Sequence, residues 1–211
     1  MTDKQTQQQE LQQQERKAER HKARQQKVKA GVDAKIAAAQ EEKGILLVLT
    51  GNGKGKSTAG FGTVARAVGH GKKAAVVQFI KGTWECGERT LLEGAGVEFH
   101  VMGTGFTWET QDKAKDTAAA EAAWAAAETL LKDPSVDLLL LDELTYMVSY
   151  HYLELARVLD ALRNRPPMQH VVVTGRACHR DIIELADTVS EVQPIKHAFE
   201  AGIKAQPGFD Y

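Results

Sequence analysis

A glycine-rich segment near residue 50 carries the residue types best suited to bind a polyphosphate. The segment reads GNGKGKS from Gly51 to Ser57. Glycines allow backbone N–H groups to approach phosphate oxygens without a clash from Cβ. Lys56 would place a positive charge on the phosphates, and the Ser57 hydroxyl would bind Mg²⁺. The candidate nucleotide-binding residues here are Gly51, Asn52, Gly53, Lys54, Gly55, Lys56, Ser57 and Thr58.

The segment departs from the generic P-loop pattern at two positions. Thr50 stands where that pattern has its first glycine, and Lys54 adds a second charge inside the loop. An apolar run precedes the loop and an amphipathic stretch follows it, which is the strand-to-helix context that a P-loop requires. We therefore interpret the segment as a P-loop rather than as a random glycine-rich turn.

A second motif, which is acidic, predicts the other half of a nucleotide-binding site. The apolar run Leu138–Leu141 ends in Asp142 and Glu143, the form of a Walker-B strand, whose acid holds Mg²⁺ directly or through water. An acidic pair after a strand is weak evidence alone, but it gains weight beside a P-loop. The predicted metal ligands are Ser57, Asp142 and Glu143, and Lys56 and Glu143 are candidate catalytic residues.

Two arginines are further candidates for phosphate contacts. Arg176 follows the apolar run that ends at Thr174, and ligands bind at the carboxyl ends of strands in open α/β sheets. Arg66 lies on the helix predicted after the P-loop. A surface salt bridge remains the alternative role for each.

The elements that must position these residues alternate along the chain. Nearly continuous apolar runs, typical of strands buried on both faces, predict strands at 45–50, 74–80, 97–102, 136–142, 170–174 and 188–192. Amphipathic stretches predict helices at 56–69, 88–94, 113–132, 151–163 and 178–186. Such alternation predicts an α/β fold with a mostly parallel six-stranded sheet flanked by helices, P-loop NTPase-like (RecA-like) in architecture.

Composition narrows the class of protein. The 211 residues carry a formal net charge of -1, which gives no reason to expect nucleic-acid binding. The two cysteines, Cys86 and Cys178, form no disulfide framework and suit a reducing cytoplasm. No apolar run approaches the roughly 20 residues that span a bilayer, and the polar N-terminus lacks the apolar region of a signal peptide. We expect a cytoplasmic protein.

The first 43 residues differ from the rest. Residues 1–15 are Gln-rich and offer only Leu11 as an aliphatic residue beyond Met1, so we expect a disordered tail. Residues 16–43 predict a basic helical arm, because Val28, Val32 and Ile36 share one helix face and seven Lys or Arg lie between Arg16 and Lys29. The basic residues form either a solvated face or an arm that docks over an anionic ligand. The folded domain is placed at 44–211.

Several segments together resemble one family, the P-loop ATP:corrinoid adenosyltransferases. The resemblance covers roughly Arg20 to the C-terminus, and the loop variant with Asn52 and Lys54 is part of it. It is carried by residues 51–57, 78–82, 87–88, 103–108, 141–145, 174–176 and 196–206.

The resemblance implies a reaction. A reduced cob(I) corrinoid attacks the 5′ carbon of ATP, the 5′-deoxyadenosyl group moves to cobalt, and triphosphate leaves. It also implies that Phe106 and Trp108 help to hold the cob(II) substrate without its lower axial ligand. The aromatics of a loop can instead pack on the core.

The resemblance further implies the cofactors and partners. These are ATP with Mg²⁺ or Mn²⁺, a corrinoid substrate, and a reduced flavoprotein as electron donor. The resemblance also implies a homodimer in which the N-terminal helix closes the site. Neither a membrane nor a nucleic acid is an expected partner. Two alternatives stay open from the residues alone. Glu143 also suits a kinase or an ATP hydrolase, and a RecA-like fold with a basic arm also suits a nucleic-acid-binding module.

Overall fold

The computed structural model describes residues 2–80, 86–103 and 112–211, and its chain divides into two units, residues 1–42 and 43–211. The first unit is the helix α1 (Thr2–Ala38). The sequence predicts a disordered tail at residues 1–15, whereas the structure describes the chain from Thr2 onward as part of this helix. Gln, Glu, Lys, Arg and Ala are good helix formers, and no Gly or Pro precedes Gly31 to interrupt them.

The second unit is built on six strands. They are β1 (Leu46–Thr50), β2 (Ala74–Gln78), β3 (Glu98–Val101), β4 (Leu138–Asp142), β5 (His170–Thr174) and β6 (Thr188–Glu191). Every observed pairing is parallel, and the order across the sheet is β3-β2-β4-β5-β1-β6. The predicted parallel six-stranded sheet is confirmed, and the carboxyl ends of all its strands meet at one edge.

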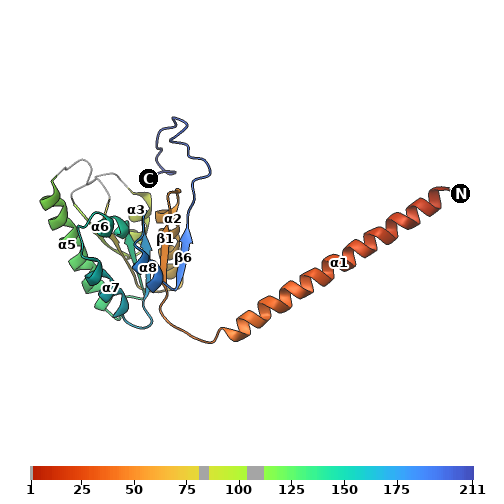
Figure 1. Ribbon diagram of the computed structural model, residues 1–211, viewed down its shortest axis with the longest axis horizontal. Coiled ribbons are helices and arrows are strands. Elements are labelled where there is room, and N and C mark those ends of the chain that lie inside the picture. The colour runs from red at the N-terminus through yellow and green to blue at the C-terminus, as the bar shows by residue number, and fades with distance from the viewer. Residues whose placement is uncertain (1, 81–85, 104–111) are drawn as a thin grey trace. The chain divides into compact units, whose positions relative to one another are not determined.

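Helices cover both faces of this sheet (Figure 1). They are α2 (Lys56–Gly69), α3 (Gly87–Gly94), α5 (Lys113–Lys132), α6 (Leu144–Ser149), α7 (Leu155–Arg163) and α8 (Arg180–Leu185). Alternate residues of β1 divide between the two faces: Leu46 and Val48 pack in the layer with α5 to α8, whereas Leu47 and Leu49 face the layer with α2 and α3. Both faces are buried in the four central strands, so β1, β2, β4 and β5 read as nearly continuous apolar runs, whereas β3 and β6 at the ends of the sheet are more exposed.

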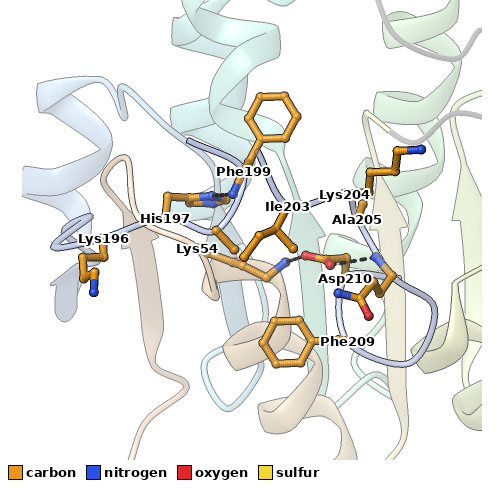
Figure 2. Close-up of a pocket in the computed structure, with 11 residues that line it drawn as sticks. Lys54, Lys196, His197, Phe199, Ile203, Lys204, Ala205, Phe209 and Asp210 are labelled. Carbon is orange, nitrogen blue, oxygen red and sulfur yellow. Dashed lines mark hydrogen bonds and ion pairs between the residues drawn. The ribbon is translucent and has the colours of Figure 1, made fainter. Parts of the chain in front are cut away.

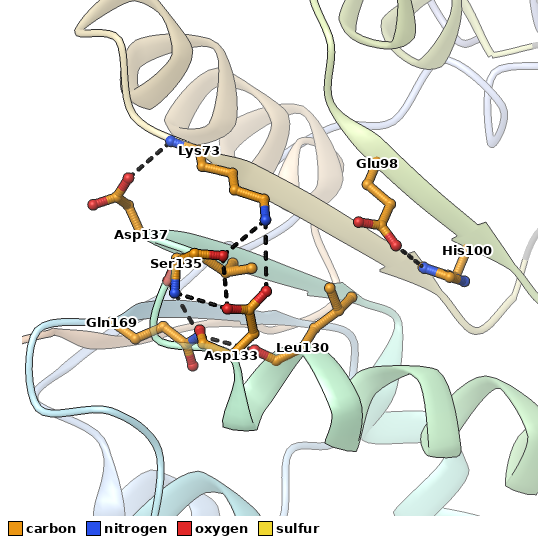
Figure 3. Close-up of polar contacts among 9 residues, drawn as sticks. Lys73, Glu98, His100, Leu130, Asp133, Ser135, Asp137 and Gln169 are labelled. Carbon is orange, nitrogen blue, oxygen red and sulfur yellow. Dashed lines mark hydrogen bonds and ion pairs between the residues drawn. The ribbon is translucent and has the colours of Figure 1, made fainter.

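The amino edge of the sheet is closed by a polar network (Figure 3). Asp137, just before β4, accepts a 2.8 Å hydrogen bond from the backbone N of Lys73, just before β2. Asp133 accepts from the backbone N of Ser135 at 2.8 Å and from its hydroxyl at 2.6 Å. These hydrogen bonds hold the pKa of Asp133 and of Asp137 below the usual value.

Buried Gln169 completes this edge just before β5. Its side-chain amide donates to the carbonyl oxygens of Leu130, Asp133 and Val136 at 2.9, 3.2 and 3.2 Å. The last carbonyls of a helix lack their regular helical partners. Those of Leu130 and Asp133 each accept a backbone N–H, and Gln169 gives both a further donor. The amino edge thus uses its polar groups to hold strands and helix ends in place.

Candidate nucleotide-binding site

The P-loop lies between β1 and α2, packed against the chain that leaves β6. Gly51 and Gly55 have φ of 95° and 114°, in the left-handed region that favours glycine. A Cβ on Gly51 would lie 2.5 Å from the carbonyl oxygen of Val192, and one on Gly53 would lie 2.8 Å from it. The backbone N of Gly53 donates to the same oxygen at 2.7 Å. Backbone geometry therefore favours glycine at Gly51, Gly53 and Gly55.

Lys56 opens α2 with a side chain that is only 6% exposed. Its Nζ donates to the carbonyl oxygen of Gly53 at 2.8 Å, which folds the side chain back over the loop. Burial lowers the pKa of Lys56, while the charge of Glu143 raises it and that of Arg176 lowers it. The structure therefore brings these three charged groups, from three separate segments, into electrostatic contact.

A cavity of about 570 Å³ opens where these groups meet. It brings together eight of the predicted site residues, namely Gly53, Lys54, Gly55, Lys56, Ser57, Thr58, Glu143 and Arg176. Gly51 and Asn52 belong to the same loop but do not line this cavity. Its volume falls in the range of about 300–1,000 Å³ that is usual for small-molecule sites.

The two acids after β4 have different positions. Asp142 is buried and accepts hydrogen bonds from the amide of Gln78 at 3.1 Å and from the hydroxyl of Thr174 at 2.7 Å. Glu143 adopts a φ of 60°, and its backbone N donates to that Thr174 hydroxyl at 3.0 Å. Because of this turn Glu143 lines the cavity, whereas Asp142 does not.

The donor set fits a hard divalent cation that is bound together with substrate phosphates. Ser57 and Glu143 both line the cavity, and Mg²⁺ is usually held by one or two carboxylates plus phosphate oxygens. Within the described residues, no group of three or more His, Cys, Asp and Glu side chains would hold a metal by itself.

Arg176 reaches the cavity through a tight turn after β5. Gly175 has a φ of 136°, and a Cβ there would overlap the Thr145 hydroxyl. That hydroxyl donates to the Arg176 carbonyl oxygen at 2.6 Å, and Ala177 follows with a φ of 48°. The strand end, the glycine and the threonine together direct Arg176 toward the P-loop.

Arg66 is a predicted site residue that lies apart from this cluster. Arg66 lies near the end of α2 and lines a separate cavity with Ile45 and Met168. Ten residue steps of about 1.5 Å separate Lys56 from Arg66 along α2, so the cavity beside the P-loop gives no support to the prediction that Arg66 contacts the phosphates. Phe106 and Trp108 lie outside the described residues.

Sequence reasoning missed the contribution of the C-terminal segment (Figure 2). Nζ of Lys54 lies 2.7 Å from a carboxylate oxygen of Asp210 and 5.8 Å from the ring centre of Phe209. A second cavity of about 370 Å³ shares Lys54, His197 and Asp210 with the first. The ion pair with Lys54 lowers the pKa of Asp210. An acid close to the C-terminus gives no local pattern that would reveal this pairing.

Helix α6 was also missed, together with the tyrosines that it presents to the cavity. Tyr146 and Tyr150 line the same space as Lys56 and Arg176. The sequence Leu144–Ser149 is a short run directly after a strand, and six residues are too few to show a helical period.

The fold and the site together define a P-loop nucleotide-binding α/β protein. Comparison with known proteins then specifies the family. A family model described as "ATP:corrinoid adenosyltransferase BtuR/CobO/CobP" matches residues 42–211, and a second, "Cob(I)alamin adenosyltransferase N terminal", matches residues 12–36. The chain belongs to the ATP:corrinoid adenosyltransferase family.

Curated relatives agree with this assignment. The chain is 65% identical to a corrinoid adenosyltransferase of Escherichia coli K12 and to one of Salmonella typhimurium, over 187 residues in each case. These alignments cover 89% of this chain and 95% of the relative. A Pseudomonas aeruginosa corrinoid adenosyltransferase is 56% identical over 188 residues, which cover 88% of this chain and 93% of the relative.

Proposed function

We propose that this enzyme transfers the 5′-deoxyadenosyl group of ATP to the cobalt of a reduced cob(I) corrinoid, in the biosynthesis or salvage of adenosylcobalamin. The observation that carries the proposal is the convergence of Lys54, Lys56 and Arg176 on one cavity beside the amides of the P-loop. In a chain of this family, that set of cations is suited to the leaving triphosphate.

The chemistry needs charge stabilisation more than a protein nucleophile. The cobalt supplies the electron pair that forms the Co–C bond, and the C5′–O bond breaks with its electron pair on the triphosphate. Lys56 and the loop amides would stabilise that developing charge. Ser57 and Glu143 would hold Mg²⁺ or Mn²⁺, which would neutralise further charge on the phosphates. Burial raises the pKa of the Cys178 thiol to about 11, so this thiol stays protonated and is a poor nucleophile.

The proposal extends to partners and to the N-terminal arm. A reduced flavoprotein would supply the electron that converts cob(II) to cob(I), and the enzyme would act in the cytoplasm. A homodimer would give the arm a partner, because Val28, Val32 and Ile36 on one face of α1 are 60%, 49% and 67% exposed. Exposed aliphatic residues at this spacing suit a contact with a second chain or with the corrinoid. Among the described residues, no helix is both long and apolar enough to cross a membrane.

The direct test incubates the protein with ATP and a chemically reduced corrinoid. We expect a light-sensitive adenosylated corrinoid and one triphosphate for each product formed. Release of ADP would instead indicate phosphoryl transfer and would favour a kinase or hydrolase. Lys56→Ala supplies the matched negative control, since it should form neither product.

The role of Phe106 and Trp108 needs a separate assay. Trp108→Ala should slow the reaction when cob(II) is supplied with a reductant, and much less when cob(I) is prepared chemically. Equal losses in both assays would exclude a role in the coordination of cob(II).

A further inference from the structure

A tilted pair of tyrosine rings forms part of the wall of the cavity that the P-loop lines. Tyr146 lies in α6 and Tyr150 directly follows it, and their ring centres are 5.5 Å apart with an interplanar angle of 35°. A third tyrosine, Tyr152, packs on Tyr150. Their ring centres are 6.0 Å apart and the angle between the ring planes is 72°. Tyr146 and Tyr150 line the cavity with the P-loop, whereas Tyr152 lines a different cavity.

The position of this pair is not explained by packing of the core. Tyr150 is 46% exposed, and Tyr146 is partly buried against the core. Tyrosine usually becomes well buried when packing decides its place. Burial and, after it, the charge of Glu143 raise the pKa of Tyr146. Its hydroxyl is therefore protonated and lies close to the charged groups around Lys56.

A nucleotide held by the P-loop must place its base against some wall within reach of the phosphates. The ribose is the only link between the α-phosphate and the base, so the base cannot lie far from the cavity that holds the phosphates. Among the described residues that line this cavity, Tyr146, Tyr150 and His197 carry aromatic rings, and the two tyrosines are the pair whose rings contact each other. Flat bases commonly bind to proteins by stacking on such side chains.

We propose that Tyr146 and Tyr150 form the platform for the adenine base of ATP, with the exposed ring of Tyr150 as the stacking surface. Tyr146 supports that ring and lies toward Glu143 and the phosphates. The proposal deepens the proposed function by locating the base within the same site. Stacking is tolerant of base identity because every base has a π face. The platform should therefore strengthen binding of ATP and GTP alike.

The test compares two ligands that share the phosphates but differ in the base. Binding of ATP and of inorganic tripolyphosphate is measured by calorimetry with Mg²⁺, in the absence of corrinoid. Tyr150→Leu should weaken ATP binding by roughly tenfold, within the range measured for base stacking, and should leave tripolyphosphate binding unchanged. Tyr150→Phe should retain ATP affinity because it keeps the aromatic ring. Tyr152→Leu, in the same cluster but outside the cavity, is the matched control and should keep both affinities.

Other outcomes would overturn the platform. Equal losses of ATP and tripolyphosphate, or equal effects of Tyr150→Leu and Tyr152→Leu, would show that the rings only support local structure. Unchanged ATP binding with weaker binding of cob(II)alamin would assign the rings to the corrinoid. Calorimetry requires no turnover, so this result is independent of the proposed reaction. If the activity assay yields ADP while Tyr150→Leu still weakens ATP binding, adenosyl transfer is rejected and the tyrosines remain the platform for the base.

Discussion

The two edges of the sheet use the same six strands for opposite purposes. At the amino edge, Asp133, Asp137 and Gln169 make hydrogen bonds that fasten strands and helix ends to one another. At the carboxyl edge, Lys56 and Arg176 face a cavity of about 570 Å³. Polar groups stabilise the framework at the first edge and are available to a ligand at the second.

Backbone geometry follows the same division. Glu143 and Ala177, two of the three non-glycine residues with positive φ among the described residues, lie at the carboxyl edge. Such conformations cost free energy and persist where the surrounding structure enforces them. The contrast indicates that the carboxyl edge is arranged for ligand binding at some expense of stability. Ligand affinity and unfolding can each be measured to test this interpretation.

Replacement of Lys56 should have the largest effect on binding. Lys56→Ala removes the buried ammonium group of the P-loop, and hydrogen bonds to charged groups contribute about 1.5–3 kcal/mol. We expect tripolyphosphate affinity to fall about 10- to 100-fold and product formation to be lost. Calorimetry measures the first effect. Lys72→Ala at the amino edge is the matched control, and a comparable loss there would erase the difference between the edges.

Replacement of Gly175 should have the largest effect on stability. Gly175→Ala places a Cβ against the Thr145 hydroxyl at a φ of 136°, where an L residue is strained. Such strain costs about 1–3 kcal/mol, and each kcal/mol lowers Tm by about 2–4 °C for a chain of this size. Thermal unfolding checks this.

Gly62→Ala is its matched control, because Gly62 lies within α2 and a Cβ there meets nothing within 4 Å. That change should raise Tm slightly. An unchanged Tm for Gly175→Ala would show that the turn before Arg176 is not strained.

Replacement of Gln169 should affect stability without affecting binding. Gln169→Leu removes the side-chain donor to three carbonyl oxygens, of which those of Leu130 and Asp133 keep a backbone donor, and a lost hydrogen bond costs about 0.5–1.5 kcal/mol. We expect a lower midpoint of urea unfolding and an unchanged Kd for ATP. Ser135→Ala, which alters an exposed part of the same network, should have a smaller effect. Weaker ATP binding would mean that the amino edge also supports the site.

Much of this framework was predictable from the sequence, because strands that are buried on both faces are apolar at successive positions. All six strands were predicted, the four central ones from continuous apolar runs and the exposed β3 and β6 from shorter, more polar runs. The residues bounding β5, α2 and α5 were predicted correctly. Strand ends elsewhere were placed too far out by one or two residues. Helix α6 was missed, and with it the tyrosine pair, since a short apolar helix has no distinguishable period.

The residues of the candidate site could be predicted where they belong to a local motif. Prediction failed where a contact joins residues that are distant in the sequence. The P-loop, Glu143 and Arg176 lie at the ends of strands that parallel pairing must bring to one edge. The pairing of Lys54 with Asp210 joins residues 156 positions apart in sequence and follows from no periodic pattern. Asp142 matches the acidic motif, yet its buried carboxylate accepts hydrogen bonds from the hydroxyl of Thr174 and the amide of Gln78.

Replacement of Asp210 should have a smaller and opposite effect on binding. Asp210 lines the same cavity as Lys56 and pairs with Lys54, so its negative charge would compete with a polyphosphate that binds there. Asp210→Asn should strengthen tripolyphosphate binding a few-fold, most clearly at low salt, because exposed charges are screened by salt. Glu184→Gln removes an equal charge from an exposed ion pair on α8 and should change nothing. Weaker binding in Asp210→Asn would instead make Asp210 a ligand of the metal or nucleotide.

Replacement of Arg66 should have the smallest effect, and it tests how far the site extends. Arg66 is exposed in the last turn of α2, where a cation stabilises the helix end by about 0.3–1 kcal/mol. Arg66→Ala should therefore lower Tm slightly and leave the Kd for ATP and tripolyphosphate unchanged. Arg176→Ala is the informative partner, since that arginine lines the cavity and its loss should weaken both ligands. If Arg66→Ala weakened them as much, phosphate recognition would extend along α2, and the functional separation of the two edges would be wrong.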